Sequence, residues 1–341
     1  MDPGTVNPTP GVPVLADLAI ESEYKEYAVF GNATLHLGER FDITAGGRFS
    51  HNDQEAFQET DGLPGLFVGP PEVFPTITSD EGVFTWSVAP RLELNDNAAI
   101  YARVAKGFRP GGPNVLPPTA PPGTPFTYNS DTILSYETGL KAQTGDGSLT
   151  ADISAFYLDW KDVQLFSVIN GFGVNTNTGG AKSIGGEATI TLRPFEGMHL
   201  TVNGAITDSE LTTDTDPLLV GGLDGDKLPF TPKYSFSASG DYERPLSDSV
   251  TGYAGGTFRF QSSQFTNFSP SGRNEFPSYG VLDLRAGVMF ERFMIEAFAR
   301  NVTNSEGLTS GGNPSTNLPP GVLTAGVIRP RTLGVMLTAE F

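Results

Sequence analysis

Residues 234–243 read YSFSASGDYE, and in this stretch the even and odd positions have opposite character. The even positions hold aromatic, small or apolar residues, whereas the odd positions hold serine, aspartate and glutamate. Residues 41–50 (FDITAGGRFS) and 332–341 (TLGVMLTAEF) alternate in the same way. Successive side chains of a β-strand point to opposite faces, so a period of two predicts strands with one apolar and one polar face.

Less regular versions of this period fill most of the chain. They predict about 13 strands, at residues 24–37, 40–52, 82–94, 98–108, 132–143, 148–162, 181–193, 198–211, 233–244, 249–262, 278–290, 293–302 and 329–341. Strands of globular proteins usually have about 5–6 residues, whereas a tilted strand that crosses a bilayer needs about 9–11. The predicted lengths favour membrane-crossing strands.

Short and long connections alternate between these strands. Short turns lie at residues 38–39, 95–97, 144–147, 194–197, 245–248 and 291–292. Long loops rich in Gly, Pro, Asn and Thr lie at residues 53–81, 109–131, 163–180, 212–232, 263–277 and 303–328. This regular segregation predicts an all-β, antiparallel up-and-down transmembrane β-barrel, with periplasmic turns at one rim and extracellular loops at the other.

The charged residues of the predicted strands fall largely on the polar parity, which we expect to point inward. They are Arg48, Arg91, Arg103, Glu137, Lys141, Asp152, Glu187, Asp241, Arg259, Asp283, Arg285, Glu296 and Arg300. A charge on the lipid face near mid-depth costs roughly 2–4 kcal/mol, which gives this bias a physical cause. Aromatic residues gather near strand ends, where membrane interfaces favour them; they are Tyr27, Phe41, Phe49, Phe84, Trp86, Tyr101, Tyr157, Tyr234, Tyr242, Phe258, Phe260, Phe290 and Phe293.

Composition excludes several other classes of protein. No apolar run approaches the roughly 20 residues of a membrane helix, and the absence of cysteine rules out disulfides and thiolate metal sites. The 21 Lys and Arg against 39 Asp and Glu give a net charge of −18, which would repel nucleic acid. A soluble β-sandwich or propeller would also alternate, but Gly and Ala on the apolar faces would fill its core poorly.

Several segments, in order and spacing, resemble the barrels of TonB-dependent receptors. The segments are YARVAKGFRPGG at 101–112, SYETGLK at 135–141, AFYLDWKD at 155–162, KSIGGE at 182–187, NVTN at 301–304 and the closing stretch 330–341. Gly186 departs from the valine that is commoner in the family. The terminal aromatic, Phe341, resembles the signal read by the outer-membrane assembly machinery. The resemblance covers nearly the whole chain from about residue 24.

The resemblance implies a barrel of the type with about 22 strands, an N-terminal plug and a TonB box. We expect neither the plug nor the TonB box in this chain, and residues 1–23 to lie on the extracellular side. Residues 24–341 would form part of a receptor barrel, either as an open curved sheet or as a rearranged smaller barrel. The implied location is the outer membrane of a Gram-negative bacterium.

The implied function is TonB-energised uptake of a scarce nutrient such as a ferric siderophore, without enzymatic activity or a cofactor. The implied partners are outer-membrane lipid, the TonB system acting through the plug, the assembly machinery and a small nutrient ligand, but no nucleic acid. Two alternatives stay open on the sequence: a passive pore or structural barrel, and a soluble β-rich carbohydrate-active protein.

Candidate ligand contacts lie in the long loops and near the loop rim. Phe126, Tyr128 and Phe172 lie in loops together with Phe67 and Phe74, and Arg109 and Lys182 lie near the rim. Each could contact an incoming ligand, but ordinary loop packing is the favoured interpretation for each residue.

The remaining motifs give little support for a catalytic, phosphate-binding or metal-binding site. The spacing of His36, His51 and His199 predicts no catalytic triad or metal cluster. Residues 178–183 resemble a phosphate loop only superficially. Four aspartates at 214, 216, 224 and 226 could bind Ca²⁺, but their spacing matches no EF-hand and favours a solvated loop.

Overall fold

The structure is a computed structural model that describes residues 16–62, 72–73, 75–114, 116, 124–169, 172–217, 219–268, 273–312 and 324–339. These residues form strands, turns and loops, and none of them is helical. Consequently, the described chain offers no apolar helix of the length that a membrane crossing requires.

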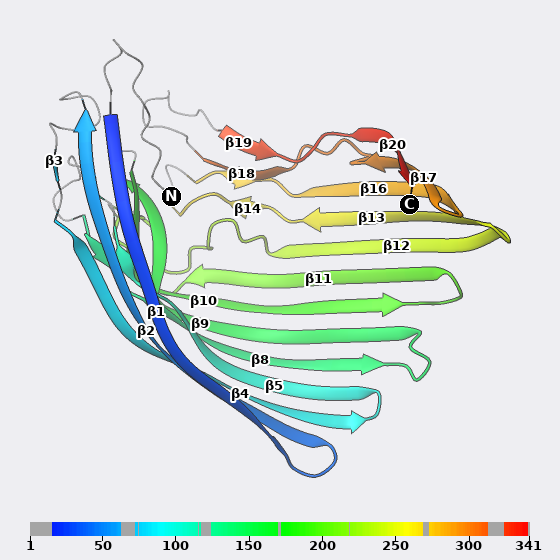
Figure 1. Ribbon diagram of the computed structural model, residues 1–341, viewed down its shortest axis with the longest axis horizontal. Helices are drawn as coiled ribbons and strands as arrows, with labels where there is room; N and C mark the ends of the chain where they lie inside the picture. Colours follow the sequence, from blue (N-terminus) through cyan, green and yellow to red (C-terminus); the bar gives the residue numbers. More distant parts are fainter. Residues whose placement is uncertain are drawn as a thin grey trace.

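One antiparallel sheet holds thirteen strands in chain order, as the sequence predicts (Figure 1). They are β1 (Ala16–His36), β2 (Phe41–Gly62), β4 (Ile77–Asn95), β5 (Ala98–Arg109), β8 (Asp131–Gln143), β9 (Leu149–Ile169), β10 (Phe172–Leu192), β11 (Met198–Leu211), β12 (Tyr234–Ser247), β13 (Val250–Gln261), β16 (Tyr279–Phe290), β17 (Phe293–Arg300) and β20 (Thr332–Ala339). Each strand pairs with its neighbour along the chain, which confirms the up-and-down topology.

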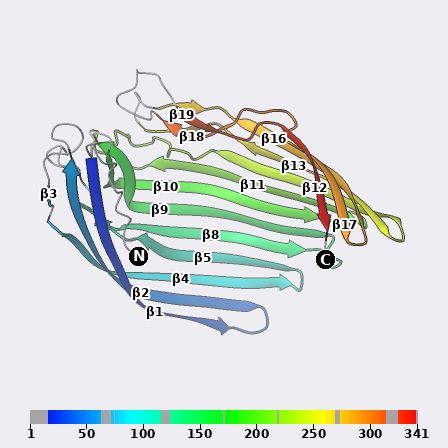
Figure 2. The same cartoon turned by 45° about the horizontal axis from the view of Figure 1, so that its top comes forward.

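Seven further short strands lie at the loop end of this sheet. They are β3 (Glu72–Val73), which pairs with β2, and three pairs: β6 (Gly112–Pro113) with β7 (Thr127–Tyr128), β14 (Gln264–Phe265) with β15 (Glu275–Phe276), and β18 (Leu308–Gly312) with β19 (Thr324–Val327). The tight turns gather at the opposite end of the sheet (Figure 2).

Two predicted loops are wrong because the strands continue through them. Residues 163–169 and 172–180 form the far ends of β9 and β10, which stay in register up to Ile169 opposite Phe172. The predicted loop 53–81 contains the end of β2 and the start of β4, with Ala56 opposite Ile77. In residues 174–178 the sequence reads VNTNT, so both faces carry polar side chains and the hydrophobic period of two is weak there.

The charged residues predicted to point inward all lie on one face of the sheet. Residues opposite each other in a ladder share a face, and several of these charges form ion pairs across neighbouring strands. Arg48 of β2 pairs with Glu26 of the neighbouring β1 at 2.5 Å, and Arg285 of β16 reaches across β13 to pair with Asp241 of β12 at 2.7 Å. On the other face, Val335 is 74% exposed. The structure therefore confirms that the sheet has one polar and one apolar face.

Tyr101 corrects one detail of that assignment. We predicted that it lies among the aromatics of the membrane interface, but it lies opposite Gly139 on the polar face. Its hydroxyl donates a hydrogen bond to Glu137 Oε1 at 2.6 Å. The space left by the glycine side chain accommodates the ring, because a Cβ at position 139 would lie 2.5 Å from Tyr101 Cε1.

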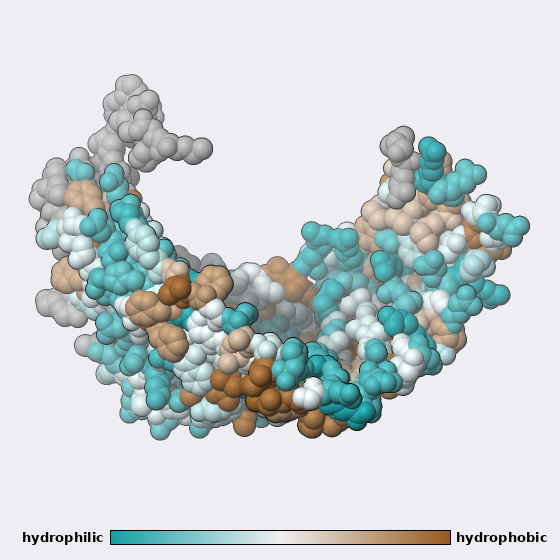
Figure 3. Space-filling view, turned by 60° about the horizontal axis from the view of Figure 1, so that its bottom comes forward, coloured by the Kyte–Doolittle hydropathy of each residue, from teal (hydrophilic) through white to brown (hydrophobic). Residues whose placement is uncertain are grey.

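The sheet is curved but open. β1 and β20 are its two edge strands, each paired on one side only among the described residues. The space-filling view shows a trough with walls rising on both sides (Figure 3). The polar face lines the hollow: Glu187, Arg259 and Arg300 border a cavity of about 610 Å³ that spans β10 to β17. We call this the concave face and the apolar one the convex face.

Candidate ligand-binding site

The loop after β5 folds across the concave face near the loop end of the trough. Its short hairpin, β6 and β7, lies against β2, β4 and β10. Two glutamines of β2 hold it: Gln54 donates to the carbonyl of Gly111, and Gln58 donates to that of Leu116 at 2.6 Å. The loop is thus fastened to strands on both sides of its own.

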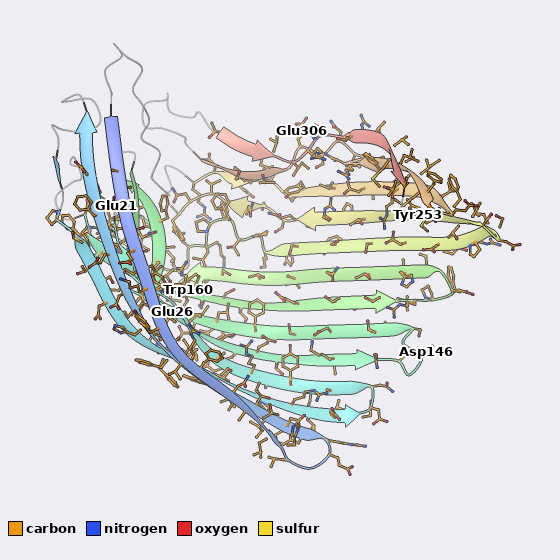
Figure 4. All side chains as sticks on the ribbon, in the orientation of Figure 1. Glu21, Glu26, Asp146, Trp160, Tyr253 and Glu306 are labelled. Carbon is orange, nitrogen blue, oxygen red and sulfur yellow. The ribbon has the colours of Figure 1, made fainter. Side chains whose placement is uncertain are left out.

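Arg109 fastens the base of this loop. Its Nε lies 2.9 Å from Asp131 Oδ2, and its guanidinium carbon lies 4.8 Å from the centre of the Trp160 ring. Trp160 lies toward the loop end of the sheet (Figure 4). The Asp131 side chain is 2% exposed and also accepts a hydrogen bond from Gln164 N at 3.1 Å. Arg109 therefore neutralises a buried carboxylate, which is a structural role.

Side-chain amides of the loop and of the β9–β10 hairpin continue the attachment. Asn114 donates to Asn175 O at 2.7 Å and accepts from Asn175 N at 3.0 Å. This pair of bonds mimics the ladder between two strands. Asn177 makes a similar pair of bonds with the backbone of Asn129, at 2.6 and 2.9 Å. The backbone of the loop is therefore held at several points.

A cavity of about 330 Å³ lies between this loop and the ends of β2 and β4. Its lining is mostly apolar and includes Ala56, Ile77, Leu116 and Phe126. Phe126 is 60% exposed. A ring held at the mouth of an apolar cavity could pack against a planar or apolar part of a ligand.

The structure places the other predicted ligand-contact residues in different parts of the sheet. Tyr128 lies in β7 opposite Gly112, whereas Phe172 begins β10 and pairs with Ile169 of β9. Lys182 lies elsewhere, on the convex face opposite Asp159 and Glu210, where its Nζ is 2.9 Å from Glu210 Oε1. Only Arg109, Phe126 and Tyr128 are brought together around the loop. Phe67, Phe74 and Phe341 lie outside the described residues.

The loop after β11 is held separately by a small hydrophobic cluster. Val163, Ala181, Leu211 and Phe268 are buried there. The aspartates of this loop cap turns: Asp214 accepts from Asp224 N at 2.8 Å, and Asp226 accepts from Leu223 N at 3.0 Å. Across the residues that the structure describes, these carboxylates do not converge on a common point that could hold an ion.

The comparisons with known proteins agree with this geometry. A polar concave face, an apolar convex face and long loops gathered at one end define the wall of a transmembrane β-barrel. The chain belongs to the TonB-dependent receptors, because residues 2–304 match the family model described as TonB dependent receptor-like, beta-barrel.

Two of the curated relatives are named as receptors. The chain is 32% identical over 212 residues to the pesticin receptor of Yersinia enterocolitica, covering 62% of this chain and 29% of that protein. It is 27% identical over 194 residues to the metal-pseudopaline receptor CntO of Pseudomonas aeruginosa, covering 57% and 25%. The chain therefore spans less than a third of the curated relatives it matches.

Two solved structures share the fold. The ferric yersiniabactin uptake receptor FyuA of Yersinia pestis superposes with a TM-score of 0.80 at 23% identity, covering 96% of this chain and 47% of that one. The closed form of the ferric-catecholate import receptor Fiu of E. coli K12 gives 0.73 at 17% identity, covering 94% and 45%.

Proposed function

We propose that this chain forms the larger part of the wall of an outer-membrane receptor that imports an iron chelate. The names of the relatives support uptake of a metal complex, since FyuA is titled a ferric yersiniabactin uptake receptor and Fiu a ferric-catecholate import receptor. The convex face would contact lipid. Energy from TonB would act through a plug that belongs to the whole receptor.

One observation supports a ligand site in particular. The loop after β5 is fixed to three other strands, yet it holds Phe126 exposed beside an apolar cavity. An ordered loop loses little conformational entropy on binding, so such a ring is a suitable contact for a chelate with aromatic groups. Arg109 would act indirectly, by holding the loop in this shape.

The test is binding of ferric yersiniabactin and of a ferric catecholate to the full chain folded in detergent micelles. Quenching of Trp160 fluorescence is the readout, measured in a Trp86→Phe background so that Trp160 is the one tryptophan left; its ring stacks on Arg109 at the loop base. We expect saturable binding of at least one iron-loaded chelate and much weaker binding of the iron-free form. Phe126→Ala should weaken binding about tenfold, equivalent to about 1.4 kcal/mol.

The matched control is Phe195→Ala, because Phe195 has a similar exposure of 59% but lies at the turn end of the sheet. Folded protein that binds neither ferric chelate would overturn the proposal. Equal affinities of the Phe126 and Phe195 variants would move the site away from this loop.

A further inference from the structure

Three side chains of types that can ligate a metal meet on the convex face near the loop end of β2 and β4. His51 Nε2 lies 3.2 Å from Asp53 Oδ1 and 3.2 Å from Asp80 Oδ2. One donor atom from each of the three residues lies within 4.8 Å of the others. The spacing of histidines in the sequence could not reveal this group, because pairing of β2 with β4 brings Asp80 to the other two residues.

The sheet itself fixes the arrangement. His51 and Asp53 are two residues apart in β2, so they share a face, and Asp80 lies directly opposite Asp53 in the ladder. Tight pairing thus sets two carboxylates side by side. Like charges directly opposite each other destabilise an antiparallel pair.

No described lysine or arginine relieves this repulsion. Lys25 lies opposite Asp53 on β1, but its Nζ is bound to Glu23 Oε2 at 2.8 Å. A second like-charged pair, Glu23 opposite Glu55, lies one step nearer the loop end on the same face. His51 is therefore the sole described partner of both aspartates, and the surroundings are acidic.

We propose that His51, Asp53 and Asp80 bind a first-row divalent cation, with Zn²⁺ as the reference ion. Zn–N and Zn–O bonds of about 2.0–2.2 Å place tetrahedral ligand atoms roughly 3.4 Å apart, close to the two separations of 3.2 Å. One imidazole nitrogen with two carboxylate oxygens suits such ions better than Ca²⁺ or Mg²⁺. The side chains are 41%, 46% and 76% exposed, which leaves water room to complete the coordination.

The site lies outside the trough and is independent of the proposed uptake site. A bound ion would join β2 to β4 beside the edge strand β1 and cancel the repulsion between the two aspartates. Its effect is therefore to stabilise the sheet beside β1, a strand that is paired on one side only among the described residues.

The test is calorimetric titration of Zn²⁺ into the full chain folded in detergent micelles. We expect one site, with affinity at least about tenfold weaker in His51→Gln and in Asp80→Asn. Co²⁺ added to the wild type should give a visible d–d spectrum that both variants lack. Zn²⁺ should also raise the unfolding temperature of the wild type but not of the variants.

His36→Gln is the matched control, because His36 also contacts an aspartate, Asp42, whose other oxygen pairs with Arg91. Its zinc affinity should equal that of the wild type. Circular dichroism confirms that each variant is folded before titration. A wild type that binds no Zn²⁺, or that binds it as tightly as His51→Gln does, would reduce the group to a simple ion pair and overturn the proposal.

Discussion

Arg109 holds the start of the loop after β5 through three kinds of contact at once. It forms a bidentate pair with Asp131, stacks on Trp160 and donates to Gln164 O at 3.1 Å. The planar guanidinium can make all three, whereas a lysine ammonium supports only a point contact. The carboxylate it neutralises is almost fully buried, so its loss leaves an unpaired charge.

Arg109→Lys should therefore loosen the loop while leaving the sheet folded. We expect a loss of about 1–2 kcal/mol at the loop base, reduced from the buried-pair range because the arginine is itself half exposed. Hydrogen exchange at the amides of Gly111, Gly112 and Asn114 should rise by about 5- to 30-fold for that loss. Arg259→Lys, which changes a pair on the open concave face, is the control. Unchanged exchange in the Arg109 variant would show that the amides alone hold the loop.

At the scale of elements, the turn between β8 and β9 is built around Asp146. Its carboxylate accepts from the Ser148 hydroxyl at 2.8 Å and from Ser148 N at 3.1 Å. Figure 4 shows Asp146 at the turn end of the sheet. Hydrogen bonds from the Thr144 hydroxyl and from Ser148 lower the pKa of Asp146 from 3.8 to about 2. The charged form is the one that the turn favours.

The turn should lose stability in acid. Because the folded pKa is lowered, the stabilisation is complete above pH 3.8 and is lost as the pH falls toward about 2. Exchange of the Ser148 amide, corrected for its intrinsic rate, should therefore become less protected between pH 4 and pH 2. Asp146→Asn removes the titration, so its protection should not change across that interval. A wild type with flat protection would contradict this account of the turn.

How far the sequence predicts an element depends on how different its two faces are. Residues 198–211 alternate clearly, and β11 has those bounds. The ends of β9 and β10 were missed because Gln164 and Asn177 bind the loop after β5, whereas Val163 belongs to a hydrophobic cluster. Those partners are far apart in sequence. The residues of the candidate site were likewise predictable only where local sequence decides. Phe126 could be placed in a loop. Lys182 could not be assigned to its face before the register of β10 with β9 and β11 was known.

At the scale of the whole molecule, the apolar part of the convex face ends toward the loop end of the sheet at a definable row of residues. Leu134 and Lys106 lie opposite each other on β8 and β5, and the same row continues through Asp159, Lys182 and Glu210 on β9, β10 and β11. One step nearer the turn end, Tyr136 and Tyr157 face each other with ring centres 6.2 Å apart. A row of charges next to a pair of tyrosines is the order expected where hydrocarbon gives way to headgroups.

Nearer the turn end than these two rows, the convex face should tolerate no charge if it contacts lipid. Val335 on β20 is 74% exposed on this face, and Thr338 lies three residues further on, on the concave face. Val335→Arg should lower the folded fraction in phospholipid vesicles, by about 2–4 kcal/mol for a site near mid-depth. Thr338→Arg adds the same charge to the same edge strand but places it in the trough, where water can solvate it, so its effect should be much smaller. Folded fractions are measured as the shift in electrophoretic mobility on heating, across a urea series. Equal losses in the two variants would mean that the two faces meet the same medium, and the convex face could then not be the surface in contact with lipid.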